Sequence, residues 1–192
     1  MSNDKLYLFV DTETTGLNFS QRGKINKNTL LEVAYILTDT DLNIIQKGEY
    51  IVGYEPSQIA YQMNDYVKNM HETNGLLNEV YNSKLTKRDV DELVYDEIIN
   101  TSILKDNVEN YKIIIAGNTV HFDKEIIRRD LPKLYSLLHF RNFDVSSVRE
   151  MVESTGLETV TITATDKKYN HRAMDDIEEA INELKQYKAL LK

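Results

Sequence analysis

Residues 6–16 read LYLFVDTETTG, and this stretch decides the fold prediction because a short apolar run meets two carboxylates. The run over residues 6–10 is continuous and rich in aromatic and branched side chains, which predicts a buried β-strand. Asp11 and Glu13 stand where this strand is expected to end, and residues two apart on a strand point the same way. Both carboxylates can therefore meet one cation while Thr12 points to the opposite side. Taken alone, the pair also fits a solvated exit from the sheet.

A second acidic position follows the next buried strand. The sequence KIIIA predicts a strand near residues 112–117, which Gly117-Asn118-Thr119 ends. Asp123 comes next and is expected to open a helix that Pro132 ends. An acid in the first turn of a helix commonly meets the positive end of the helix dipole, so Asp123 alone has a structural interpretation as well.

A third segment, HRAMDDI at residues 171–177, opens the most clearly amphipathic helix of the chain. At about 100° per residue its apolar positions share one stripe, namely Ala173, Ile177, Ala180, Ile181, Leu184 and Leu191. Asp176 lies about 90° from the centre of this stripe, whereas Asp175 lies roughly opposite it. Asp176 is therefore expected to reach a site beside the core, and Asp175 to face water. Each of these residues also has a structural interpretation. The two acids would stabilise the positive end of the helix dipole, and His171 would be an ordinary polar residue before the helix.

Together these segments resemble the DEDDh exonucleases, a superfamily named for four acidic residues and one histidine. Within it, successive segments are similar to those of the oligoribonucleases: DTETTGL at 11–17, LEVA at 31–34, MHETNGL at 70–76, GNT through Asp123 at 117–123, FDVSS at 143–147 and HRAMDDI at 171–177. The resemblance runs from about residue 5 to the C-terminus. It implies an α/β fold with a ribonuclease-H-like mixed sheet flanked by helices.

The resemblance also implies a set of ligands and a base. Asp11, Glu13, Asp123 and Asp176 would bind two divalent ions, Mg²⁺ or Mn²⁺, with Glu13 also near the attacking water. Two such ions roughly 4 Å apart serve phosphodiester cleavage, and hard oxygen ligands hold them. His171 would be the general base, since an imidazole titrates near neutral pH. The chain has no cysteine and four histidines, which argues against a structural zinc site.

Five further residues are expected to bind substrate by the same resemblance. Leu17 would wedge against a base, and His71 would contact the substrate. Arg141 and Ser146 would hold a terminal 5′ phosphate, with Thr119 nearby; arginine suits phosphate because its fork donates two hydrogen bonds. The structural alternatives are loop packing for Leu17, a helix-surface position for His71, a salt bridge for Arg141 and a helix N-cap for Ser146.

Two segments depart from the family pattern. Phe140 and Asn142 flank Arg141 where the family commonly has Tyr-Arg-Tyr, and phenylalanine lacks the hydroxyl that would bind a phosphate. Val-His-Phe at residues 120–122 also replaces the usual small and polar residues before Asp123. In the family, a residue of the Tyr-Arg-Tyr segment reaches the neighbouring subunit's site, so a homodimer is expected.

Composition limits the substrate and the location. The chain has 192 residues, of which 41% are hydrophobic, and this suits one exonuclease domain over residues 1–192. A net charge of −8 argues against long duplexes held through many phosphates and favours short single-stranded oligoribonucleotides. No stretch approaches 18 apolar residues and the N-terminus lacks a signal-peptide pattern, so no membrane association and a cytoplasmic location are expected.

Periodicity predicts strands near 5–11, 29–38, 44–53, 112–117 and 141–144, and helices over about 57–106, from 122, over 145–155 and over 172–190. Residues 18–28 are expected to form a surface loop near the site. The leading hypothesis is a 3′-to-5′ exoribonuclease that degrades short oligoribonucleotides to 5′-mononucleotides. The alternatives are a DEDDh exonuclease of the proofreading or tRNA-trimming type, acting on DNA or longer RNA, and a non-catalytic RNA-binding protein.

Overall fold

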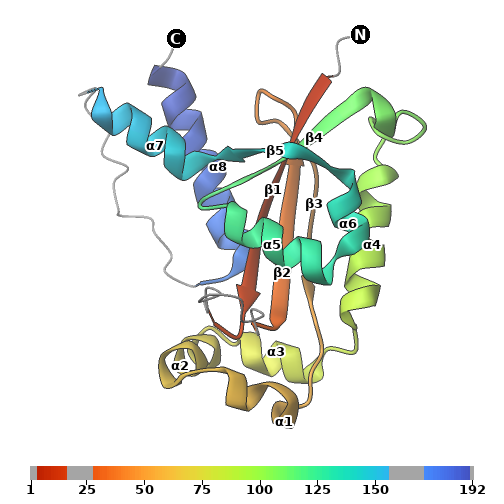
Figure 1. Ribbon diagram of the computed structural model, residues 1–192, viewed down its shortest axis with the longest axis vertical. Coiled ribbons are helices and arrows are strands. Elements are labelled where there is room, and N and C mark those ends of the chain that lie inside the picture. The colour runs from red at the N-terminus through yellow and green to blue at the C-terminus, as the bar shows by residue number, and fades with distance from the viewer. Residues whose placement is uncertain (1–3, 17–27, 156–170, 191–192) are drawn as a thin grey trace.

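A mixed sheet forms the centre of the computed structural model, which describes residues 4–16, 28–155 and 171–190 (Figure 1). Its five strands lie in the order β3-β2-β1-β4-β5. They are β1 (Asp4–Thr14), β2 (Leu30–Thr38), β3 (Ile44–Ile51), β4 (Tyr111–Gly117) and β5 (Leu138–Asp144). Strands β1 to β3 form an antiparallel meander, whereas β4 is parallel to β1 and β5 is parallel to β4.

Helices cover both faces of this sheet. One layer consists of α4 (Lys87–Ile99), α5 (His121–Asp130) and α6 (Pro132–Leu137), and the other of α7 (Val145–Ser154) and α8 (Ala173–Leu190). Because side chains alternate along β1, Leu8 and Val10 pack in the first layer and Phe9 in the second. The central strand is thus buried on both sides, as the apolar run predicts.

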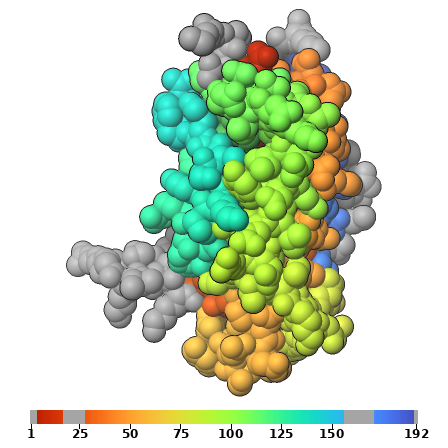
Figure 2. Space-filling model, turned by 90° about the vertical axis from the view of Figure 1, so that its right-hand side faces the viewer, coloured from red at the N-terminus to blue at the C-terminus, as the bar shows by residue number. Residues whose placement is uncertain are grey.

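A third group of helices lies at the end of the sheet toward which β1 runs (Figure 1). It comprises α1 (Pro56–Ile59), a 3-10 turn directly after it (Ala60–Gln62), α2 (Asp65–Thr73) and α3 (Leu76–Asn82). A second 3-10 turn, Val108–Asn110, directly precedes β4. Figure 2 shows this group below the long yellow-green helix α4. Its own small core includes Leu31 of β2, which joins it to the sheet.

The α/β fold with a mixed sheet flanked by helices is confirmed, but several boundaries differ. β1 continues to Thr14, because pairing with β2 extends to Thr14 and Leu30, so the two acids lie within the strand rather than after it. The helical region expected over 57–106 is divided into α1 to α4 and ends at Ile99. Gly75, with φ of +83°, separates α2 from α3, a conformation that glycine adopts without strain. β5 begins at Leu138, three residues before the expected start at 141.

The amphipathic helix α8 matches its prediction closely. Its buried residues include the expected apolar stripe, Ala173, Ile177, Ala180, Ile181 and Leu184, while Leu191 lies outside the described residues. Among the described residues, none of the helices combines the length and hydrophobicity that crossing a membrane requires.

Candidate active site

Three carboxylates from two elements converge at the end of β1. Asp11, Glu13 and Asp176 each offer an oxygen, and these oxygens all lie within 4.8 Å of one another. Asp11 and Glu13 alternate with Thr12 and so face the layer of α7 and α8, and Asp176 lies in the first turn of α8. Such a group of half-buried carboxylates is suited to a hard divalent cation.

Asp123 approaches the same place from the opposite layer. It lies in the first turn of α5 and is 5% exposed. Its Oδ1 atom accepts hydrogen bonds from the backbone N–H of Thr12 at 2.9 Å and from the Thr12 hydroxyl at 2.7 Å. Thr12 points away from the other acids, as predicted, and this orientation lets it hold Asp123 beside them.

Burial and mutual repulsion make the four carboxylates hard to ionise together. Burial raises the pKa of Asp11 well above its usual range, and the charges of Asp123 and Glu13 raise it further. Burial, followed by the charge of Asp176, raises the pKa of Glu13 to about 9. Burial also raises the pKa of Asp123 to about 7, although the hydrogen bonds from Thr12 oppose the shift. A bound divalent ion reverses this cost because its positive charge favours the ionised form.

Of the two adjacent acids of α8, the group of three contains Asp176, which is the one that the helical periodicity selected. Burial raises the pKa of Asp176 to about 6, repulsion from Glu179 adds to the shift, and His171 acts in the opposite direction. Asp175 is half-buried rather than fully exposed, and it does not belong to the group of three. His171 is therefore near enough to Asp176 to influence the pKa of its carboxyl.

His171 stands immediately before α8 in a left-handed backbone conformation, with φ of +46°. Its carbonyl accepts a hydrogen bond from the Asn74 side-chain amide at 2.8 Å. The structure thus brings all five residues of the DEDDh pattern to one end of the sheet.

A buried ion pair beside the site was not foreseen from the sequence. Glu32 is opposite Glu13 in the pairing of β2 with β1 and is fully buried. Arg172 binds it through Nε at 3.0 Å and Nη2 at 2.7 Å. The available signal was a glutamate within the otherwise apolar strand sequence LLEVA, since a buried carboxylate needs a partner.

The expected substrate residues do not all lie beside the acids. Ser146 donates to Asn118 Oδ1 at 3.2 Å, which joins the start of α7 to the turn after β4. Thr119 lies in that turn, exposed, with φ of +52°. The N-cap of α7 is Asp144, so the N-cap interpretation of Ser146 is wrong. Leu17 lies outside the described residues.

His71 is enclosed rather than exposed. Its side chain is 0% exposed, and its Nε2 lies 3.0 Å from the carbonyl oxygen of Thr14 and 4.0 Å from Glu13 Oε2. Because a carbonyl only accepts, Nε2 carries the proton, and burial lowers the pKa of the imidazole. The helix-surface interpretation is therefore wrong, and His71 binds the last residue of β1, Thr14.

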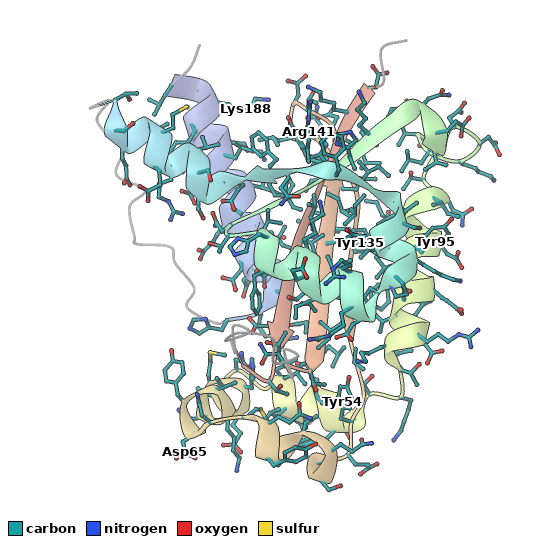
Figure 3. All side chains as sticks on the ribbon, viewed as in Figure 1. Tyr54, Asp65, Tyr95, Tyr135, Arg141 and Lys188 are labelled. Carbon is teal, nitrogen blue, oxygen red and sulfur yellow. The ribbon has the colours of Figure 1, made fainter. Side chains whose placement is uncertain are left out.

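Arg141 lies away from the acids of its own chain. Figure 3 shows it near the end of the sheet opposite the α1–α3 group. The register agrees, since Asn142 pairs with Ile115, which is level with Leu8. Asp11 is three residues further along, about 10 Å, and two strands across, roughly another 10 Å. Arg141 is exposed and stacks over the Phe140 ring, 5.4 Å from its centroid.

Comparisons with known proteins show the family and the fold. The exonuclease family (RNase_T) matches residues 8–184. A probable oligoribonuclease of Dictyostelium discoideum is 32% identical over 184 residues, which are 96% of this chain and 89% of that protein. The nuclease domain of 3′hExo, a DEDDh family member solved with rAMP, has a TM-score of 0.54 at 15% identity and covers 99% of this chain and 94% of that one.

A zinc-bound complex of E. coli exonuclease I with single-stranded DNA has a TM-score of 0.66 at 16% identity and covers 97% of this chain. The present chain spans only 41% of that protein. At such low identity the two solved structures show a common fold, which is the ribonuclease-H-like fold that the sequence predicts. By its family match and its similarity to the Dictyostelium protein, this chain belongs to the exonuclease family, among the oligoribonucleases.

Proposed function

We propose that this protein is a 3′-to-5′ exoribonuclease that hydrolyses short oligoribonucleotides to 5′-mononucleotides. The observation that carries the proposal is the convergence of Asp11, Glu13 and Asp176 within 4.8 Å, with Asp123 held beside them by Thr12. This arrangement, in a chain of the oligoribonuclease family, is suited to phosphodiester hydrolysis.

The donor set fits two divalent ions, Mg²⁺ or Mn²⁺. Four carboxylates that resist joint ionisation offer only hard oxygen atoms, which is the ligand chemistry of these cations. When bound, such ions polarise the phosphate and activate water. Asp11, Glu13, Asp123 and Asp176 would hold them, and Glu13 would also orient the attacking water.

His171 is the proposed general base. Its place before α8, within electrostatic reach of Asp176, suits it to take a proton from water at the ion cluster. Its imidazole would then release the proton to solvent, because the side chain is half-buried rather than enclosed.

The substrate is proposed to enter from the end where β1 and β4 finish. Ser146 and Thr119 lie at this end and would bind the phosphate of a short strand, with Leu17 wedged against a base and His71 holding the strand end that carries Glu13. A net charge of −8 favours a substrate with few phosphates.

Arg141 fits this proposal only across a subunit boundary. It is displaced from the acids of its own chain, on the edge strand β5, beside an exposed Phe140. We therefore include in the proposal a homodimer in which each Arg141 serves the partner's site. A cytoplasmic location and a single domain over residues 1–192 complete the proposal; the absence of cysteine suits a reducing compartment.

The test uses 2-mer, 7-mer and 24-mer RNA and DNA, labelled at the 5′ end, with Mn²⁺. We expect the RNA 2-mer and 7-mer to be shortened stepwise from the 3′ end, and Asp11→Asn to abolish the reaction while Asp175→Asn retains it. Internal cleavage, or activity that survives in Asp11→Asn, would refute the proposal. Preference for the 24-mer or for DNA would instead favour the proofreading or tRNA-trimming type.

A further inference from the structure

The backbone that carries His171 is held from outside its own helix. With φ of +46°, His171 occupies a conformation that costs a residue other than glycine on the order of 1 kcal/mol. Asn74, at the corner between α2 and α3, donates from Nδ2 to the His171 carbonyl at 2.8 Å. The same side chain accepts from the N–H of Leu76 through Oδ1 at 3.0 Å, which fixes its orientation.

The next residue is held more firmly. The guanidinium of Arg172 donates three hydrogen bonds to the fully buried Glu32 of β2, from Nε to Oε1 at 3.0 Å and to Oε2 at 3.2 Å and from Nη2 to Oε1 at 2.7 Å. It donates two more to Glu79 of α3, at 2.8 and 3.2 Å. Paired donors of this kind fix both distance and angle. Arg172 therefore ties the start of α8 to the sheet and to the α1–α3 group at once.

Glu32 also receives the end of the helix itself. Its Oε2 atom accepts from the backbone N–H of Ala173 at 3.3 Å, so one carboxylate binds both the arginine and the positive end of α8. Glu32 lies opposite Glu13, within the electrostatic field of the acid cluster. Arg172 supplies the compensating charge there, which leaves the four DEDD carboxylates to the cations.

We propose that Asn74, Arg172, Glu32 and Glu79 form a positioning clamp, named here the α8 clamp, that sets the turnover rate by fixing where His171 and Asp176 stand over β1. This inference rests on the proposed function. Arg172 directly follows His171, and its carbonyl accepts the backbone N–H of Asp176 at 3.1 Å, so movement of Arg172 displaces both residues. The substrate residues Ser146 and Thr119 belong to other elements. Loss of the clamp therefore lowers kcat and leaves KM nearly unchanged.

The principal variants remove the clamp without leaving a lone buried charge. Glu32→Gln with Arg172→Gln replaces the ion pair by two neutral amides, of which the one at position 172 is shorter than the arginine. Both partners are changed because removing one alone would leave the other charge buried without its partner. Glu79→Gln weakens only the outer half of the clamp. The control is Arg149→Gln, which breaks another paired contact of α8, with Glu183 at 2.5 and 2.6 Å.

We expect kcat for a dinucleotide to fall at least tenfold, and on the order of 100-fold for a displacement of 1 Å, in the double variant, with KM within twofold. Glu79→Gln should lower kcat less than the double variant does. Arg172→Lys should keep part of the rate that the double variant loses, because lysine keeps the charge. Arg149→Gln should lower Tm and leave kcat unchanged. A double variant with wild-type kcat, or an equal loss of kcat in Arg149→Gln, would overturn the clamp.

A second readout separates failure of the clamp from failure of the proposed function. The rise in Tm on adding Mn²⁺ needs no turnover and depends on where Asp176 stands. The double variant should show less than half of the wild-type rise, and Arg149→Gln the full rise. If wild-type protein cleaves no RNA, the function fails, and the Mn²⁺ series still decides the clamp: equal rises in the wild type and the double variant overturn it.

Discussion

Replacing Asp123 by asparagine should make the metal-free protein more stable. The asparagine side chain would keep an oxygen in place to accept both bonds from Thr12, at 2.9 and 2.7 Å in the parent, while the substitution removes a buried charge. The pKa of Asp123 is raised from 3.8 to about 7, with burial as the largest cause. A carboxyl whose pKa is raised by folding favours the native state at low pH, and this contribution is lost as the pH rises through the folded value.

The size of the effect follows from the pKa difference. At 1.36 kcal/mol per pKa unit, ionised Asp123 costs the native state about 4 kcal/mol at pH 8, above both pKa values. At pH 5 the unfolded chain is ionised and the native site is not, so only about 2 kcal/mol is expressed. For a domain of this size each 1 kcal/mol moves Tm by roughly 2–4 °C. Asp123→Asn should therefore raise Tm by about 8–16 °C at pH 8 and by roughly half of that at pH 5.

The assay is thermal unfolding in chelator at pH 5, 6, 7 and 8, followed by circular dichroism. Asp175→Asn is the matched control, because its parent residue lies beside Asp176 but outside the group of three acids. A parallel series in Mn²⁺ should narrow the advantage of the variant at pH 8, since the wild type gains about 2.7 kcal/mol at an ion concentration 100 times Kd and the variant gains less. If Asp123→Asn is no more stable than the wild type at pH 8, or if its advantage does not grow with pH, the electrostatic reasoning is refuted.

Three further predictions concern the rest of the site. Lys124 donates to the Phe140 carbonyl at 3.0 Å and to Asn142 Oδ1 at 2.7 Å, and so holds the irregular part of β5 that carries Arg141. Lys124→Met should therefore raise KM for a 5′-phosphorylated dinucleotide several-fold, and an unchanged KM would contradict this. Phe140→Tyr, which restores the family's hydroxyl, should lower the Kd for the same dinucleotide in a titration without metal. Equal affinities would show that the missing hydroxyl does not affect dinucleotide binding. Gly117→Ala, at φ of +154° with its new Cβ 3.0 Å from the Val10 carbonyl oxygen, should cost about 1–3 kcal/mol in urea unfolding, and a cost below about 0.5 kcal/mol would count against the strain.

Local periodicity predicted those parts of the site that depend on the geometry of a single strand or helix. Alternation along a strand placed Asp11 and Glu13 on one side, and the helical wheel selected Asp176 over Asp175. These predictions needed only the geometry of a strand and of a helix. The end of β1 could not be located in the same way, because its last residues are ordered by pairing with β2.

Contacts between distant segments could not be predicted from the sequence, for a different reason. Glu32 and Arg172 are 140 residues apart, and neither residue type indicates its partner by spacing. The position of Arg141 depends on the register of β5, which shifts between Ile113 and Ile115 of the neighbouring strand. A resemblance can suggest that Arg141 binds phosphate, but only the register shows that it is displaced from the acids of its own chain.

The topology explains why the acids gather where β1 ends. α5 and α8 pack on opposite faces of the sheet, so Asp123 and Asp176 approach the last residues of β1 from opposite sides. At that point Glu13 and Asp11 face α8 while Thr12 faces α5 and holds Asp123. Cations bound there would join the two helical layers through the central strand. In the metal-free protein, the packing of both layers must therefore offset the repulsion among the four carboxylates. For this reason, removing the single charge of Asp123 should raise the free energy of unfolding of the whole domain.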